Sequence, residues 1–489
     1  MHMRRTAKLI PPVLFSALAL TATFGSGACG SSDSSGDNGG GDAGKDGPIW
    51  TAPGAIVSFS PTENDDNVSV HAPIQIVYDE AVQVTPQSVS LSGPGSTIVA
   101  TTVRLSEDRK TVTVTPVSDL VAPTTLTLTI NDIRTADGAA AQTRSWSWTV
   151  PAWLKVGKPA PAKSQGPYQA ATRLAIDSKD RISVFTDGDV AVNTIESARG
   201  DWTRRGGPLN GGQATSHQTV AVNRDGAPFV AFLANETHVQ GLSDTSWLDL
   251  GGTTHGVPAG GFGGVVCGPS LAVEPTTGKL LLAHTVLVND AGLKMYVESF
   301  ANGRWAHEGD ALNVSSDSAT FPNIAASNTG KRYAMYQTLA TPSTAYVLTW
   351  TGSGWSSVGA PASVGSFRSA LTIDRDDKPV VFGCFPDLQF RRWDGSQWST
   401  IGPAVGSCPS EAASAYVGRN DQGRIFAAWS IKQGDVHVAE VTAGGWTPLP
   451  TPAAFPSFGL VEGVVVDSTG IPVTSWGIDG GIQVVRSNK

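Results

Sequence analysis

The sequence has little charge, no long apolar run and none of several motifs that identify common enzymes. Charged residues make up 16% of the 489 residues, and aromatic residues make up 8%. This balance excludes collagen, coiled coils, polytopic membrane proteins and wholesale disorder. Zinc-ligand pairs, phosphate-binding loops and dinucleotide fingerprints are also absent from the sequence. What remains is a turn-rich globular chain with 55 Gly and 31 Pro.

Positive charge is scarce as well. Lys and Arg number 34 against 42 Asp and Glu, so the formal net charge is −8. No cluster of Lys or Arg follows the first eight residues. A chain this acidic is repelled by phosphate backbones, which excludes nucleic acid and makes anionic lipid a poor partner.

The first thirty residues have the organisation of an export signal. Three cationic residues precede an apolar run, Leu9–Phe24, that is too short to cross a bilayer comfortably. The run leads into Ser26-Gly27-Ala28-Cys29, which resembles the lipobox of bacterial lipoproteins. The resemblance implies a signal peptide over residues 1–28 and a lipid anchor on Cys29. It also implies an exported protein held in the outer membrane or at the cell surface. The alternative is ordinary signal-peptidase cleavage near Ala28.

Residues 29–49 predict a flexible linker behind that anchor. The stretch Gly30–Pro48 is built almost entirely of Gly, Ser, Asp and similar residues. Such a composition cannot bury apolar surface, so the segment is expected to act as a tether.

Residues 50–150 predict an Ig-like β-sandwich. Short β-rich segments recur between turns, and no helical period is present. The segment resembles bacterial Ig-like domains of the S-layer type, and this resemblance implies a spacer or adhesive stalk without chemistry of its own. It rests on Phe59-Ser60-Pro61-Thr62, Ile74–Val82, Lys110–Pro116 and Ile133–Gly138. The expected strands are Ala55–Ser60, Ile74–Tyr78, Val89–Ser92, Thr111–Thr115, Leu126–Ile130 and Ser145–Val150.

An acidic turn, Glu63–Asn67, follows the first of these strands. Its oxygen ligands would suit Ca²⁺, although their spacing matches no known calcium loop. The alternative is a solvated turn without a metal. No other cofactor or metal site is predicted.

Residues 151–489 contain two motifs that each occur seven times. One is a Trp that is followed four residues later by Gly or its replacement, at spacings of 43 to 58 residues. The other is an apolar strand, a polar turn and a second apolar strand, as in Leu174–Phe185. A period near 48 residues with about four short strands is typical of propeller blades. The Trp motifs begin at Trp153, Trp202, Trp247, Trp305, Trp355, Trp398 and Trp446.

The order of the two motifs predicts how the repeat closes. A Trp motif opens the region at Trp153, whereas the chain ends after Ile482–Val485 with no Trp strand behind it. Pairing Trp153–Gly157 with the last repeat would leave no exposed sheet edge. The sequence therefore predicts an all-β protein, an Ig-like sandwich followed by a seven-bladed β-propeller closed by an N-terminal strand. The repeated Trp is expected to be packing core between blades.

The predicted ligand-binding residues are acidic residues near the turn that joins the second and third strands of a repeat. They occur in six of the seven repeats and would lie on one face of a propeller, where they favour a cation or a polyhydroxylated ligand. The alternative is that Asp and Asn simply suit hairpin turns. The set is Asp187, Asp189, Glu236, Asp290, Asp387, Asp435 and Asp479.

A catalytic serine is not predicted. Ser216-His217 could face Asp187, but no nucleophile-elbow glycine pattern surrounds Ser216. No catalytic residue is assigned from the sequence.

The remaining cysteines predict one disulfide. Cys29 is assigned to lipid. In the order of strands within the repeat, Cys384 ends the second strand of the fifth repeat and Cys408 lies in the loop that leads into the sixth, which places both on the same face. Export to an oxidising compartment favours a disulfide between them. Cys267 is left over and is expected to be buried.

These features together predict a monomeric surface lipoprotein that binds a glycan or a protein without catalysis. Two alternatives stay open, a polysaccharide lyase or hydrolase that uses channel acids, and a purely structural envelope component. Fold alone does not choose among them, because propellers host binding and catalysis alike.

Overall fold

In the computed structural model, the chain is described in segments after the first 52 residues. The predicted signal peptide, Cys29 and the predicted linker lie outside them. Within them the chain is all-β, with two short 3₁₀ turns, η1 (Pro86–Ser88) and η2 (Pro94–Ser96), and no helix that meets the length and apolarity of a membrane span. The described residues are 53–161, 174–186, 191–196, 200–209, 216–233, 237–251, 268–288, 292–314, 316–340, 343–359, 362–364, 368–408, 414–431, 435–452, 460–478 and 481–489.

The N-terminal part forms two four-stranded antiparallel sheets and one short strand pair. All six strands predicted from the sequence are present. The four that were not predicted are three two-residue strands and an edge strand, whose alternation is too short or too weakly buried to stand out. One sheet is β1 (Ile56–Ser60), β2 (Ile74–Tyr78), β7 (Thr111–Pro116) and β6 (Thr101–Leu105); the other is β10 (Arg144–Val150), β8 (Thr124–Ile130), β4 (Val89–Ser92) and β5 (Ile98–Val99); the pair is β3 (Val82–Gln83) with β9 (Arg134–Thr135).

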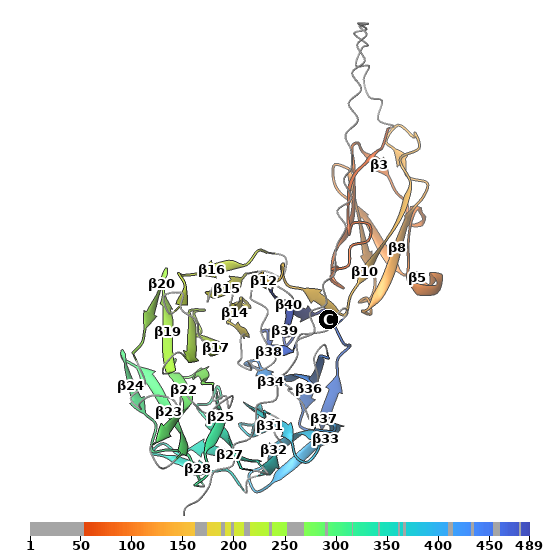
Figure 1. Ribbon diagram of the computed structural model, residues 1–489. Coiled ribbons are helices and arrows are strands. Elements are labelled where there is room, and N and C mark those ends of the chain that lie inside the picture. The colour runs from red at the N-terminus through yellow and green to blue at the C-terminus, as the bar shows by residue number, and fades with distance from the viewer. Residues whose placement is uncertain are drawn as a thin grey trace, which may run out of the picture. The chain divides into compact units, whose positions relative to one another are not determined.

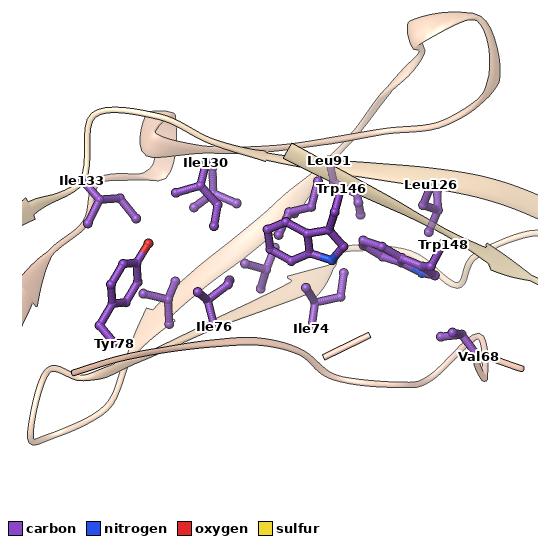
Figure 2. Close-up of a cluster of buried hydrophobic side chains, with 14 of the residues drawn as sticks. Val68, Ile74, Ile76, Tyr78, Leu91, Leu126, Ile130, Ile133, Trp146 and Trp148 are labelled. Atoms are coloured by element: carbon purple, nitrogen blue, oxygen red, sulfur yellow. The ribbon is translucent and has the colours of Figure 1, made fainter. Parts of the chain in front are cut away.

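Alternate residues of these strands fill the core between the two sheets. In β2 the side chains of Ile74, Ile76 and Tyr78 are buried, while those between them are not. Trp146 and Trp148 of β10 point into the same space (Figure 2). A fully buried large side chain contributes about 2–3 kcal/mol of transfer free energy, so this cluster is a principal source of stability. Burial also raises the pKa of Tyr78 to about 12.

The described residues from Trp153 onward form seven further antiparallel sheets (Figure 1). Each predicted strand–turn–strand motif is the hairpin of the first two strands of one sheet, and the Trp motif supplies the fourth strand or its start. The first three sheets are β13 (Leu174–Ile176), β14 (Ile182–Thr186), β15 (Ala191–Ile195) and β16 (Thr203–Arg205); β17 (Ser216–Val222), β18 (Pro228–Leu233), β19 (Thr237–Ser243) and β20 (Ser246–Asp249); and β21 (Ser270–Val273), β22 (Leu280–Val288), β23 (Gly292–Ala301) and β24 (Arg304–His307).

The last four sheets continue the pattern, with a short extra strand in the fourth sheet. They are β25 (Ala319–Ala326), β26 (Arg332–Thr338), β27 (Ser343–Trp350) and β28 (Trp355–Ser357), with β29 (Ala362–Val364) on β27; β30 (Ala370–Ile373), β31 (Pro379–Cys384), β32 (Leu388–Trp393) and β33 (Trp398–Gly406); β34 (Ser414–Arg419), β35 (Ile425–Ser430), β36 (His437–Thr442) and β37 (Gly445–Pro448); and β38 (Val461–Val466), β39 (Pro472–Ile478) and β40 (Gly481–Ser487), joined by β11 (Trp153–Lys155) and β12 (Ala160–Pro161).

The strand that opens the repeat pairs with the strand that ends the chain, as predicted. Trp153 lies opposite Ser487, and Lys155 lies opposite Val485. The first strand of each sheet also packs against the first strand of the next, and β38 of the seventh sheet packs against β13 of the first. The edge strand β11 therefore covers what would otherwise be an open edge of β40.

The repeated Trp side chains join each sheet to the one before it. Every indole Nε1–H donates a hydrogen bond to a backbone carbonyl at or near the outermost strand of the preceding sheet. The expected packing role thus includes a hydrogen bond, which a buried or half-buried indole requires. The pairs are Trp153 with Pro450, Trp202 with Lys158, Trp247 with Arg205, Trp305 with Leu250, Trp355 with Glu308, Trp398 with Val358, and Trp446 with Pro403.

A polar side chain at the end of the first strand closes the first hairpin in most of the sheets. In the seventh sheet, Oδ1 of Asp467 accepts hydrogen bonds from the backbone N–H groups of Thr469 and Ile471, at 3.0 and 2.8 Å. This local capping explains why the motif carries a short polar residue at that point. The equivalent residues that accept backbone N–H groups are Asp177, Asn223, Ser327, Asp374 and Asn420.

Candidate functional site: a recess between the fourth and fifth sheets

A small recess lies between the fourth and fifth sheets, and most of its lining side chains are buried. Its wall is mainly aliphatic, with two aromatic side chains and a single charged one. Small-molecule sites usually combine such an apolar wall with a few polar groups. The lining residues are Ala345, Val347, Val358, Val381, Phe385, Arg391 and Trp398.

The turn that carries Phe385 is held from several sides. The Phe385 N–H donates to the carbonyl of Asp387 at 2.8 Å. The Phe385 carbonyl accepts hydrogen bonds from the side chains of Gln389 and Arg391. These hydrogen bonds fix the backbone of the turn, and the Phe385 ring itself is buried.

A disulfide braces the same turn. Cys384, which is fully buried and directly precedes Phe385, is bonded to Cys408, with their Cα atoms 5.6 Å apart. This is the pair predicted from the sequence. The 24-residue separation encloses Phe385, Arg391 and Trp398, so three of the seven lining residues lie inside the disulfide loop.

Arg391 is the charged member of the recess. Its guanidinium carbon lies 4.7 Å from the centroid of the Phe385 ring, and its Nη2 donates to the Phe385 carbonyl at 3.2 Å. Its buried Nε has no hydrogen-bond partner among the described residues. Burial lowers the pKa of Arg391, because removal from water disfavours the charged form.

Several other arginines in the described sheets have carboxylate partners, whereas the buried Nε of Arg419, like that of Arg391, has no hydrogen-bond partner among the described residues. The neighbouring Arg392 contacts both Asp374 and Asp376. Within the described residues, Arg391 makes no ion pair, although it is partly withdrawn from water. Further arginine–carboxylate pairs are Arg181 with Asp177, Arg332 with Glu274 and Glu308, Arg424 with Glu440, and Arg486 with Asp467.

The side chain at the position of Arg391 varies among the seven sheets. Its partner on the second strand, Val381, is the third residue after Lys378, which closes the first hairpin. Arg391 lies two residues before Trp393, which pairs with Trp398. The equivalent residues of the other sheets are polar or charged in three and apolar in three, namely Asn193, Gln240, Glu298, Leu348, Ala439 and Val485.

The predicted acidic set is described at only two positions. Asp387 is exposed in the turn between β31 and β32, close in sequence to Phe385 of the recess. Asp435 lies before β36, where its Oδ1 is 2.8 Å from Nε2 of His437. In the described part of the chain, no hydrogen bond joins these two acids. The others, Asp187, Asp189, Glu236, Asp290 and Asp479, lie outside the described residues.

The acids of the turn Glu63–Asn67 have protein partners. Glu63 pairs with Arg144 at 2.8 Å, and Asp66 pairs with Lys155 at 2.9 Å. Asp65 accepts the backbone N–H of Asn67. Across the described residues, no group of three or more His, Cys, Asp or Glu side chains is arranged to hold a metal ion.

Two other predictions made from the sequence fall on residues that the structure does not describe. The side chains of Ser216 and His217, and all of Asp187, lie outside what the structure describes, as does Cys267. Arg391, by contrast, is a site residue that sequence reasoning missed. An alignment of the third strands would not have singled it out, because the equivalent residues of the first three repeats are Asn193, Gln240 and Glu298.

Comparison with known proteins identifies the N-terminal part of the chain. Residues 50–150 match the bacterial Ig-like domain family. This agrees with the two packed sheets and shared core described above. No curated protein matches the sequence.

Solved structures resemble the chain at low identity. A lectin from Burkholderia pseudomallei is 16% identical and covers 65% of this chain and 98% of its own, with a TM-score of 0.41. A variant of the Aleuria aurantia lectin, in complex with Fucα1-6GlcNAc, is 15% identical and covers 55% and 93%, with a TM-score of 0.36. YCF48 from Cyanidioschyzon merolae is 12% identical and covers 68% and 98%, with a TM-score of 0.43. At these values none of them assigns a role to a residue of this chain.

Proposed function

We propose that the protein binds glycans without catalysis and that the recess between the fourth and fifth sheets is the binding site. The observation that carries this proposal is that Trp398 and Arg391, both partly exposed, meet at the recess, with the buried Phe385 ring beneath the guanidinium. A pyranose ring has C–H faces that pack on aromatic surface and hydroxyl groups that accept hydrogen bonds from a guanidinium. The indole and the guanidinium at the mouth of the recess offer both kinds of contact.

The seven sheets, in this proposal, are the blades of one closed propeller. The first-strand packing, the indole hydrogen bonds and the pairing of β11 with β40 support this arrangement. A closed ring holds neighbouring sheets in fixed register, so a recess between two of them keeps its shape before a ligand arrives.

The proposal places the propeller at the bacterial surface. The lipobox-like segment would attach Cys29 to a membrane, residues 29–49 would act as a tether, and the Ig-like domain would be a spacer. Such an arrangement would present the recess to extracellular or envelope polysaccharide.

The test is a glycan-array screen of the full chain, followed by calorimetric titration of the glycans that are retained. We expect a restricted set of glycans to bind and to be recovered chemically unchanged. Replacement of Arg391 by Gln removes the guanidinium and should weaken binding by about tenfold or more. The matched control is Arg304→Gln, an exposed position on β24 far in sequence from the recess lining.

Thermal unfolding of each variant separates loss of binding from loss of folding. Retention of no glycan by a folded full chain would refute the proposal. Turnover of a polysaccharide without stable binding would refute its non-enzymatic part and support a lyase or hydrolase instead.

A further inference from the structure

Only two residues connect the Ig-like domain to the first strand of the sheets that follow it. The last strand of the domain, β10, ends at Val150, and β11 begins at Trp153. The residues between them, Pro151 and Ala152, both accept hydrogen bonds from Asn488, which follows β40. The Pro151 carbonyl accepts one from the side-chain Nδ2 at 2.7 Å, and the Ala152 carbonyl accepts one from the backbone N–H at 2.9 Å.

The side chain of Asn488 also binds a loop of the Ig-like domain. Its Oδ1 accepts the backbone N–H of Val70 at 2.9 Å, and its Nδ2 donates a second hydrogen bond to the Val68 carbonyl at 3.0 Å. Both N–H donors of the amide and its oxygen thus have backbone partners. Only 5% of Asn488 is exposed, and Val68 and Val70 belong to the buried core of the domain.

A second asparagine, Asn67, binds the outer edge of β11. Its Oδ1 accepts the N–H of Lys155 at 2.7 Å, and its Nδ2 donates to the Lys155 carbonyl at 3.1 Å. Lys155 lies opposite Val485 of β40, and the next residue, Val156, donates its N–H to the Val484 carbonyl. Because bonded and non-bonded pairs alternate in an antiparallel ladder, the backbone groups of Lys155 point away from β40. Asn67 therefore takes the place that a further strand would have on β11.

A freely hinged spacer does not need buried polar contacts with the part that follows it, because each contact costs desolvation when it is broken. The residues Ala52–Lys489 also form one compact unit. We infer that the Ig-like domain and the seventh sheet fold as one cooperative unit, and that Asn488 is the residue that couples them. Release of β40 or β11 would then also free the loop at Val68–Val70. Glycan binding plays no part in this coupling.

Calorimetric unfolding of the full chain tests the coupling. The wild type should show one transition for both parts. Asn488→Ala leaves the Val70 N–H and the side-chain-bonded carbonyls without their partner, so the Ig-like domain should unfold in a separate, earlier transition. Ile76→Val makes a small cavity in the core of the domain and should lower the single Tm of the wild type. In the Asn488→Ala background it should lower only the earlier Tm.

Hydrogen exchange locates the change in the molecule. In Asn488→Ala, a peptide that covers residues 66–71 should exchange about tenfold to a hundredfold faster, because the Val70 N–H loses its acceptor. A peptide from β35 in the sixth sheet should exchange as in the wild type. Asn488→Asp keeps the size of the side chain but cannot donate to the two carbonyls, so it should also give two transitions. The matched control is Lys489→Ala, an exposed neighbour whose replacement should change neither measurement.

Three results would contradict the inference. Two transitions in the wild type would show that the parts are not coupled. A single transition in Asn488→Ala, or unchanged exchange of residues 66–71, would overturn the role of Asn488. Equal acceleration of exchange in β35 would show that Asn488 stabilises the whole fold and not this junction.

Discussion

Side-chain volume at the innermost strands is limited by the close approach of neighbouring sheets. A Cβ added to Gly418 would lie 2.5 Å from the carbonyl oxygen of Val464 in the next sheet. Because this contact is with backbone, it cannot be relieved by rotating a side chain. The aligned residues of the other sheets are mostly small as well, namely Ala175, Ala221, Ala272, Ala325, Thr372 and Val465.

Gly418→Ala should therefore lower the free energy of unfolding by about 1–3 kcal/mol through overpacking. The matched control is Gly444→Ala, where an added Cβ meets nothing within 4 Å. The two midpoints of urea unfolding provide the measurement. Equal midpoints for the two variants would show that β34 and β38 are not packed this closely in solution.

A second residue-scale prediction concerns acid stability. Burial alone would raise the pKa of Asp467, but hydrogen bonds from Ile471 and Thr469 and the charge of Arg486 hold it below its ordinary value. A carboxyl whose folded pKa is lowered stabilises the fold fully above its unfolded pKa, near 4, and loses this contribution as pH falls through the folded value.

Asp467→Asn should reduce stability at pH 7 and should narrow the difference in Tm between pH 7 and pH 3. The control is Asp201→Asn, an exposed residue for which the same scan should follow the wild type. A variant whose Tm falls as steeply with acid as that of the wild type would contradict the assignment.

At the scale of elements, the hairpins and their order relative to the Trp strands could be predicted from the sequence, whereas the recess could not. The alternating pattern of Leu174–Phe185 and its six counterparts determines the first hairpin of each sheet, and the Trp motifs mark the fourth strands. The order of these two motifs along the chain was sufficient to predict the pairing of β11 with β40 and of Cys384 with Cys408. It does not say which side chains of adjacent sheets leave space between them, because this depends on volumes contributed by two separate repeats.

The same limit explains why sequence reasoning selected the acidic turns and missed Arg391. Periodicity places Arg391 on a third strand without showing what its side chain faces, and only packing shows that its guanidinium lines a recess. The acidic residues were selected by turn position, which equally suits residues that cap hairpins. The polar residues that close the first hairpins, such as Asp467, show how common that structural role is in this chain.

The disulfide provides the element-scale prediction. In the chain-entropy model, a crosslink over 24 residues stabilises the fold by about 3 kcal/mol. Replacing both Cys384 and Cys408 by Ala should lower Tm and should also weaken glycan binding, because the loop carries Phe385, Arg391 and Trp398. Treatment with a reducing agent should bring the wild type toward the double variant and should leave the double variant unchanged. Unaltered binding in the folded double variant would show that the recess does not depend on the brace.

At the scale of the whole molecule, the proposal joins a repeated scaffold to one recess. Indole hydrogen bonds link all seven sheets, and a polar residue closes the first hairpin in six of them; these shared features account for stability. Function is proposed to reside at the recess between the fourth and fifth sheets, where Arg391 is the charged lining residue. This division predicts that Arg391→Gln weakens glycan binding, whereas the same change at the exposed Arg304 leaves it unaltered.

The most direct test is a crystal structure of the full chain with its tightest-binding glycan. The account predicts electron density for a sugar at the mouth of the recess, with its ring against Trp398 and a polar group within hydrogen-bond distance of the Arg391 guanidinium. Density for the sugar at any other place on the protein, with the recess occupied by solvent alone, would contradict it.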